Sequence, residues 1–537
     1  MFFKWSRKDK KAEGFSTINN TCCFFFRGYV IWNHKLFFGN DFLPILKNHI
    51  RNDELDKNIR QYNGIFNIVL SRNNSVKVYN DRWGGFPLYY YQGTNELVIS
   101  NNWQRILPHL PARKIQKNAA LEMHTFGYVM GEKTLVENIY EFLPHTVTEI
   151  DLNENQIKKN INDYWQFHYP FNNHKKAKQL EREFADLWKQ QIRVYTDFLS
   201  ENDRAAYIPL SGGLDSRLLL YYVDRAGIKT NTMTYGASLL SNEIKTALQV
   251  LPHVRNTLET RILFYNKSYL SELSNQNFDN YDQIVCGHID KRLLYLCSQP
   301  DNYFYIPGHD ANYMAGENIK HQMLKWKDKQ DIMNYIFKFK SSPITRHLIE
   351  NNQIYRDILN NSLQQTIPEE SDLISNFNRW NGEQRQRRYI LRSSIMPLSD
   401  NQRILIPYFD YKLMDFFINL PLDSLLNQKL YQNTQIRYLY RENPELIKIK
   451  RGGTKRVRII RNNYFTEYYP KLINEIKRIL KISQPQKLTW EPSINWQKYI
   501  FPKLNLLDYL DLDGLSNSQF INIQYLMTIS EVATALD

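Results

Sequence analysis

The 537-residue sequence is poor in cysteine and contains no long apolar run. Its four cysteines, Cys22, Cys23, Cys286 and Cys297, form neither a CxxC pair nor a disulfide framework, so we expect a reducing, cytoplasmic environment and no structural zinc. No stretch approaches the roughly 18 apolar residues that a membrane helix needs, and the first residues contain no signal-peptide core. The sequence therefore predicts no membrane partner.

Two kinds of motif are also missing. No GxxxxGK[ST] loop occurs, and no recognised nucleic-acid-binding motif accompanies the net charge of +14. The basic residues are dispersed among acidic ones, so we expect no nucleic-acid partner. An anionic substrate such as ATP, or an acidic partner surface, accounts for the charge as well.

The pattern of apolar segments predicts an α/β multidomain protein. Between about Thr21 and Asp151, short β segments alternate with Asn, Gly and Asp turns, which indicates an antiparallel β domain with helices between strands. Residues 166–178 contain Pro, Asn and a basic run without apolar periodicity, and we interpret them as a linker between domains at 1–165 and 179–537. After this linker, alternating helices and strands predict a parallel sheet that binds ligands at the carboxyl ends of its strands.

The strongest chemical signal is a Gly-rich turn between a predicted strand and a predicted helix. Its two glycines let the backbone approach a phosphate, the serines add hydroxyl donors, and the helix dipole favours an anion. The aspartate can hold a magnesium ion that bridges phosphates. A plain Gly-Gly turn with a helix cap is the alternative, but the complete unit favours a pyrophosphate cradle made of Leu210, Ser211, Gly212, Gly213, Leu214, Asp215 and Ser216.

The SGGLDS segment is similar to the pyrophosphate loop of ATP pyrophosphatases, and its place after a β domain resembles the asparagine synthetase family. β-Lactam synthetases and lasso-peptide cyclases belong to this family. In the first half, residues 62–66 (YNGIF) resemble the family's LNGxF strand, and residues 81–90 (DRWGGFPLYY) resemble its RDxxGxxPLYY signature. The resemblance implies an amino-terminal Ntn-like antiparallel sandwich of the class II glutamine amidotransferase type. It also implies a Rossmann-like parallel sheet with a helical carboxyl-terminal part.

Further segments follow in the order expected for this family. Residues 241–247 (SNEIKTA) resemble the helix that borders the adenine pocket, residues 305–309 (YIPGH) resemble the turn facing the α-phosphate, and residues 406–410 (IPYFD) resemble its VPFLD segment. Each segment alone is weak, because Gly turns and Asp caps are common. Together they imply that Thr234, Glu243 and Gly308 contribute to nucleotide binding.

The first domain departs from the family at its expected catalytic positions. Relatives that hydrolyse glutamine begin Met-Cys, because the amine of the processed cysteine assists its own thiolate, whereas residue 2 here is Phe2. Cys22 and Cys23 could act only after an unusual cleavage, and CCFFF predicts a buried strand. Arg27 stands where the resemblance places an oxyanion-hole Asn. We predict that the domain has no glutaminase activity.

The second domain departs at a metal position and before the IPYFD segment. An ungapped match to GHTGDFxAG puts Asn312 at the magnesium position, and a shifted match puts Asp310 there. Arg403 and Leu405 occupy the places of the family's Glu-x-Arg pair.

A catalytic lysine is expected in the basic segment KIKRGGTK. The resemblance implies that this lysine neutralises charge on the α-phosphate and pyrophosphate, and Lys450 is the better match, with Lys455 second. A solvated basic surface is the alternative interpretation.

These features together predict an ATP- and Mg²⁺-dependent, AMP-forming amide ligase with catalytic residues Asp215 and Lys450 or Lys455. Its substrates would be a small-molecule or peptide carboxylate and an amine or ammonia, and the implied intermediate is an acyl-adenylate. A macrolactam or lasso-peptide cyclase is the alternative in the same class. A degenerate ATP-binding scaffold in a biosynthetic complex is the alternative in another class. A biosynthetic partner protein or a homodimer would fit either interpretation.

Overall fold

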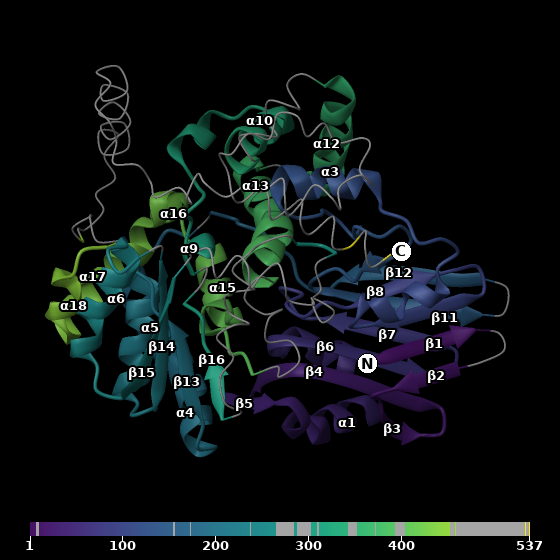
Figure 1. Cartoon of the computed structure of the whole chain (residues 1–537), viewed down its shortest axis with the longest axis horizontal. Coiled ribbons are helices and arrows are strands. Elements are labelled where there is room, and N and C mark those ends of the chain that lie inside the picture. The colour runs from purple at the N-terminus through teal and green to yellow at the C-terminus, as the bar shows by residue number, and fades with distance from the viewer. Residues whose placement is uncertain are drawn as a thin grey trace.

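The computed structural model describes residues 1–6, 10–153, 156–171, 173–236, 238–264, 284–286, 302–308, 311–341, 352–370, 372–392 and 403–451, with positions 457, 532 and 536. Antiparallel strands occupy the first part of the chain, and a parallel sheet with many helices follows (Figure 1). This arrangement confirms the predicted α/β multidomain fold class.

Two antiparallel sheets pack against each other in the first part. Apolar side chains from both sheets, among them Phe3, Val69, Leu97 and Ile150, form a buried cluster between them. The first sheet has the order β10-β8-β9-β1-β2, with β1 (Phe2–Ser6), β2 (Lys10–Glu13), β8 (Tyr89–Gln92), β9 (Glu96–Ser100) and β10 (Tyr140–Glu141). The second has the order β12-β11-β7-β6-β4-β3, with β3 (Ser16–Asn19), β4 (Cys22–Trp32), β6 (Asn63–Arg72), β7 (Ser75–Asn80), β11 (Thr146–Asn153) and β12 (Gln156–Asp163).

A further strand and the helices α1, α2 (Leu55–Asn58) and α3 also belong to this part. Strand β5 (Lys35–Phe38) pairs with β4 beside the second sheet. Leu46 and Ile50 of helix α1 (Leu43–Arg51) belong to a second buried cluster together with side chains of β4 and β6, so α1 covers part of that sheet. Helix α3 (Lys117–Phe126) is buried along most of its length.

The segment that we expected to be a linker is packed against the rest of the protein. Residues 164–171 and 173–176 contain neither helix nor strand and lie between β12 and α4 (Ala177–Glu201). Phe167 and Tyr169 are buried, and the Phe167 ring centroid lies 5.2 Å from that of Trp83. The Tyr169 amide donates to the Ser375 hydroxyl over 3.3 Å. The connection is therefore part of the core.

The parallel sheet has the strand order β15-β14-β13-β16. Its strands are β13 (Ala205–Pro209), β14 (Thr230–Gly236), β15 (Thr257–Phe264) and β16 (Tyr303–Tyr305). Tyr207 of β13 pairs with Asn231 of β14 on one side and with Tyr305 of β16 on the other. Helix α5 (Leu214–Arg225) follows β13, and α6 (Asn242–Val250) follows β14.

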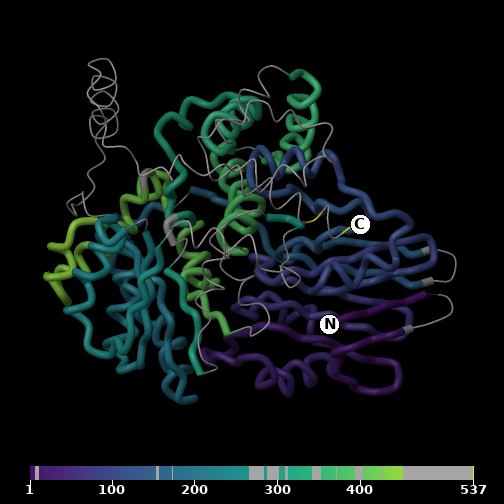
Figure 2. The backbone as a smooth tube through the Cα atoms, in the orientation of Figure 1, coloured from purple at the N-terminus to yellow at the C-terminus, as the bar shows by residue number. Residues whose placement is uncertain are grey.

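Helices make up most of the rest of the described chain, and several lie between the antiparallel sheets and the parallel sheet (Figure 2). They are α9 (Ala311–Met314), α10 (Lys329–Lys340), α12 (Gln353–Thr366), α13 (Leu373–Trp380), the π-helix η7 (Asn381–Leu391), α15 (Tyr411–Ile418), α16 (Leu422–Leu425), α17 (Lys429–Glu442) and α18 (Pro444–Lys448). Within the described ranges, no helix is both long and apolar enough to cross a membrane.

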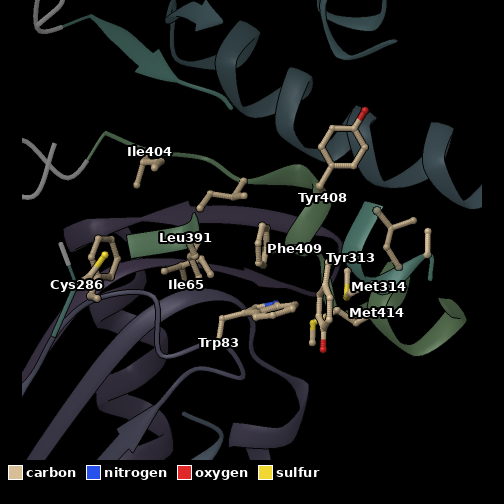
Figure 3. Close-up of a cluster of buried hydrophobic side chains, with 14 of the residues drawn as sticks. Ile65, Trp83, Cys286, Tyr313, Met314, Leu391, Ile404, Tyr408, Phe409 and Met414 are labelled. Carbon is tan, nitrogen blue, oxygen red and sulfur yellow. The ribbon is translucent and has the colours of Figure 1, made fainter. Parts of the chain in front are cut away.

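The two parts share one continuous apolar core (Figure 3). Ile65 and Trp83 from the first part face Leu391, Phe409 and Met414 from the second. The ring centroids of Trp83 and Phe409 are 4.3 Å apart in an edge-to-face contact, a geometry that aromatic pairs favour.

Polar contacts add to this interface. The Asn63 amide donates to Asp410 Oδ2 over 2.7 Å, and its oxygen accepts from the Tyr411 amide over 2.8 Å. The Arg82 guanidinium pairs with Asp415 at 2.6 Å. These contacts thus join the first part of the chain to α15 and the residues before it.

Candidate functional site

The SGGLDS loop lies at the carboxyl end of β13, where the chain turns into α5. Residues 210–213 bridge the last strand residue, Pro209, and the first helical residue, Leu214. Gly308 packs against the start of α5, because a Cβ built on it would lie 3.0 Å from the Ser216 backbone nitrogen. A side chain at position 308 would therefore push into the first turn of α5.

The amides of the loop are engaged by acceptors from the protein itself. The Ser211 amide donates to Ser216 Oγ over 3.2 Å, and the Gly213 amide donates to Ser211 Oγ over 3.1 Å. The Gly212 amide donates to the carboxylate of Glu243, which is exposed in the first turn of α6. A negatively charged group thus occupies one of the loop donors at a helix N-terminus, as expected for an anion cradle.

A polar atom without a partner lies at the end of the neighbouring strand. Thr234, near the carboxyl end of β14, is 1% exposed, and its hydroxyl has no hydrogen-bond partner among the described residues. Most buried polar groups have a partner, so a ligand that reaches this strand end would satisfy the hydroxyl. Thr234, Glu243 and the loop lie at the carboxyl ends of neighbouring strands, and nucleotide binding by them stays a prediction.

Asp215 is buried at the start of α5 and is engaged as a hydrogen-bond acceptor. Its Oδ1 accepts from the Tyr431 hydroxyl over 2.5 Å and from the Gln435 amide over 2.7 Å. Its backbone carbonyl accepts from the Tyr408 hydroxyl over 2.9 Å. Burial raises the pKa of Asp215, although the bonds from Tyr431 and Gln435 oppose this shift.

The surroundings of Asp215 bear on the predicted magnesium site. One carboxylate oxygen of Asp215 already accepts two hydrogen bonds, and within the described part of the chain no group of three or more His, Cys, Asp or Glu side chains could hold a metal ion. Asp310 and the Asn312 side chain lie outside the described residues. Magnesium ligation by Asp215, Asp310 or Asn312 therefore stays a prediction.

Arg217 was not singled out from the sequence, yet it organises the site. It is fully buried, and its guanidinium donates to the carbonyls of Gly212 (3.1 Å), Leu446 (3.0 Å), Ile449 (2.9 Å) and Lys450 (2.9 Å). Burial lowers its pKa to about 10. Arg217 thus ties the SGGLDS loop to the segment after α18.

The hydrogen bonds of Arg217 hold the basic residues Lys450 and Arg451 near the loop. The backbone of Lys450 lies beside it through Arg217, while the Lys450 side chain is exposed. Arg451 lies near enough to Asp215 to lower the pKa of that carboxyl against the effect of burial. Arg451 is a further cation that sequence reasoning missed, and Lys455 lies outside the described residues.

The segment around IPYFD links this site to the first part of the chain. Leu405 is fully buried, and its amide donates to the Tyr305 carbonyl over 3.0 Å, so residues 403–405 continue the sheet beside β16. Asp410 caps α15 through the amide of Lys412. Leu405 is thus a packing residue where the resemblance expects a charged one.

The expected glutaminase positions are filled by bulky or buried side chains. Phe2 is 6% exposed, and the Arg105 guanidinium lies 4.6 Å from its ring centroid. Arg27 is 3% exposed and lies 4.5 Å from the Phe86 ring centroid. Of the cysteines within the described residues, Cys22 and Cys286 are buried and Cys23 is half-buried.

Comparison with known proteins supports one part of this description. The model of the glutamine amidotransferase domain family matches residues 46–165, and no curated protein matches the chain.

Similar solved structures include NMN synthetase from Francisella tularensis (13% identity, TM-score 0.21, 40% of this chain and 97% of that one). NAD+ synthetase from Burkholderia pseudomallei is another (13% identity, TM-score 0.17, 47% and 90%). The allosteric regulatory enzyme of purine biosynthesis is a third (10% identity, TM-score 0.18, 46% and 61%). Likenesses this distant carry no functional argument. The chain thus contains a glutamine amidotransferase-like region and, outside it, the loop described above.

Proposed function

We propose that this protein is an ATP-dependent amide-bond ligase that forms an acyl-adenylate, releases AMP and pyrophosphate, and does not hydrolyse glutamine. The observation that carries the proposal is the strand-loop-helix unit at the carboxyl end of β13, whose Gly212 amide is occupied by a carboxylate. We also propose that the chain is divided into two domains, residues 1–165 and residues 179–537, with a connecting segment at 166–178.

In the proposed first step, a substrate carboxylate oxygen attacks the α-phosphorus of ATP and pyrophosphate leaves. The amides of Gly212 and Gly213 and the hydroxyls of Ser211 and Ser216 would bind the leaving pyrophosphate, after Glu243 has moved away from the Gly212 amide. Such preorganised donors are the main means by which a site of this kind lowers a barrier.

In the second step, an amine or ammonia attacks the acyl carbon and forms the C–N bond, the bond between the acyl carbon and the bridging oxygen breaks, and AMP leaves with that oxygen. The proton of the amine must pass to a base or to solvent. Lys450 and Arg451 lie close to the loop and would offset the charge of the phosphates.

The interpretation of the first part rests on Arg27. A buried guanidinium stacked on Phe86 stands where the resemblance requires an amide donor to an oxyanion. The first part would then serve the ligase as a packed wall, and free ammonia or a substrate amine would supply the nitrogen. A macrolactam cyclase, with both reacting groups on one peptide, is a narrower form of this proposal.

A catalytically inactive ATP-binding scaffold is the second candidate. Two observations favour it: Asp215 accepts hydrogen bonds from Tyr431 and Gln435, and Leu405 packs where a charged residue is expected.

Exchange of labelled pyrophosphate into ATP, measured with a panel of carboxylates, separates the two candidates. The ligase should catalyse exchange that depends on one class of carboxylate, and Gly213→Trp, which fills the loop, should abolish it. A scaffold should bind ATP and catalyse no exchange with any carboxylate. Absence of both exchange and ATP binding would refute the assignment of the loop itself.

A further inference from the structure

The carboxylate of Glu243 occupies a backbone donor that the SGGLDS loop would offer to a phosphate. The Gly212 amide donates to this carboxylate, and the carbonyl of Gly212 accepts from the Arg217 guanidinium over 3.1 Å. Gly212 is thus held between an anion and a cation. Backbone amides at the start of a helix bind phosphate and carboxylate oxygens alike, so both kinds of group can use this donor.

The charge of Glu243 also acts on the buried Arg217. Burial lowers the pKa of Arg217 to about 10, and the negative charge of Glu243 opposes this shift. The hydrogen bonds of Arg217 go to neutral backbone carbonyls. A ligand that takes the place of Glu243 beside this buried cation is therefore favoured if it is itself an anion.

The Glu243 side chain is free to leave the loop. It is exposed in the first turn of α6, and among the described residues it accepts no other hydrogen bond and forms no ion pair. An exposed carboxylate that gives up one protein donor regains water donors. The contact with Gly212 is thus reversible.

The backbone before Glu243 is anchored more firmly than its side chain. The Ser238 amide donates to Ser241 Oγ over 3.1 Å, and the Ser241 amide donates to the Ser238 carbonyl over 2.9 Å. A Cβ built on Gly236 would lie 2.5 Å from the Ser241 Cβ, so the end of β14 packs closely against the start of α6. Release of the Gly212 amide therefore needs a rotation of the Glu243 side chain and no movement of α6.

We propose that Glu243 is an internal competitor of phosphates: it occupies the Gly212 amide in the free protein and must leave before pyrophosphate or the phosphates of ATP bind. The inference rests on the proposed function, because it assumes that the loop binds phosphates. The contact would keep the empty loop in its binding conformation and would weaken the affinity of the site by the free energy of one hydrogen bond.

Titration calorimetry of the full chain with inorganic pyrophosphate, at one fixed magnesium concentration, tests this inference. Glu243→Gln keeps the size of the side chain and removes its charge. Its dissociation constant should be about tenfold lower than that of the wild type, the factor expected for one charge-assisted hydrogen bond. Glu259→Gln removes another exposed carboxylate of the same sheet, which pairs with Arg261 at 3.0 Å, and should bind as the wild type does.

Glu243→Asp separates displacement from plain charge repulsion. Its carboxylate keeps the charge but is one methylene shorter, so it falls short of the Gly212 amide from the anchored backbone, and pyrophosphate should again bind more tightly than to the wild type. Wild-type affinity in Glu243→Asp overturns the inference, and so does equal or weaker binding by Glu243→Gln. Those results leave the proposed function intact. If neither the wild type nor Glu243→Gln binds pyrophosphate, the proposed function fails together with the inference.

Discussion

The expected glutaminase site and the SGGLDS loop differ in the side chains that surround them. Around Phe2 and Arg27, large side chains pack closely, with the Arg105 guanidinium over the Phe2 ring and the Arg27 guanidinium over the Phe86 ring. Around the SGGLDS loop, the amides of Ser211 and Gly213 donate to serine hydroxyls of the same motif, and the Gly212 amide donates to the carboxylate of the exposed Glu243 side chain. We propose from this difference that the first region contributes packing and that the second can bind an anion.

The largest effect should come from Asp215→Ala. Under the ligase proposal, this change removes the acceptor of Tyr431 and Gln435 at the start of α5, and carboxylate-dependent pyrophosphate release should fall by at least about a hundredfold. Tyr431→Phe, which removes one donor and leaves the carboxylate, should cost much less. Undiminished release in Asp215→Ala would refute the role of this side chain.

Arg217→Met should be the most destabilising change near the loop. It leaves four carbonyls without their donor, three of them in buried hydrogen bonds, so we expect the free energy of unfolding to fall by about 3 kcal/mol. Urea denaturation measures this loss, and Arg225→Met at the exposed end of the same helix is the matched control. A loss no greater than that of the control would mean that Arg217 does not organise the site.

The burial of His124 in the first part can be tested through the pH dependence of stability. Burial lowers the pKa of His124, on α3, to about 4, below its ordinary value near 6.5. The unfolded chain therefore takes up a proton that the folded chain resists, and stability is lost as the pH falls from 6.5 to 4. His124→Gln should reduce this acid-induced loss by between about 2 and 3 kcal/mol. His174→Gln, at an exposed position, should leave it unchanged.

A smaller effect is expected at the interface. Asn63→Ala removes one donor to Asp410 and one acceptor for the Tyr411 amide, which should cost about 1.5 kcal/mol of unfolding free energy. Denaturation monitored by tryptophan fluorescence would measure this cost, with the exposed Asn52→Ala as the control. A cost close to zero would show that the apolar contacts alone hold the parts together.

The last expectation is that no change occurs. Neither the wild type nor Phe2→Cys should release glutamate from glutamine, because Arg27 still fills the place of the oxyanion donor. Glutamate release by Phe2→Cys above a heat-inactivated control would show that the first region differs from an active site by a single side chain.

The features that could be predicted from the sequence are those encoded locally. The short apolar segments that form β4 and β6, and the strand-turn-helix order around SGGLDS, are each encoded within a few residues, and the structure confirms the sheets that they indicate. The contacts of Asp215 with Tyr431 and Gln435 span 216 and 220 residues. No local pattern could reveal them.

For some residues, the sequence motif was recognised but the contacts of the side chain were not predicted. Asn63 belongs to a motif that suggested the amidotransferase fold, yet its side chain binds Asp410 and Tyr411 across the interface. Glu243 was expected near an adenine pocket, and it accepts a hydrogen bond from the Gly212 amide. In both cases the motif identified the residue, but only the three-dimensional structure identified the partner.

The burial of Phe167 and Tyr169 in the connecting segment has a consequence for the way this chain can be shortened or divided. A gene that encoded only the part after α4 would produce a protein with an apolar face where Trp83 and Ile65 now lie. Loss of the first part would therefore require many compensating substitutions at once. The first part of the chain, even without a catalytic role, can therefore be retained in evolution because the part after α4 depends on it for folding.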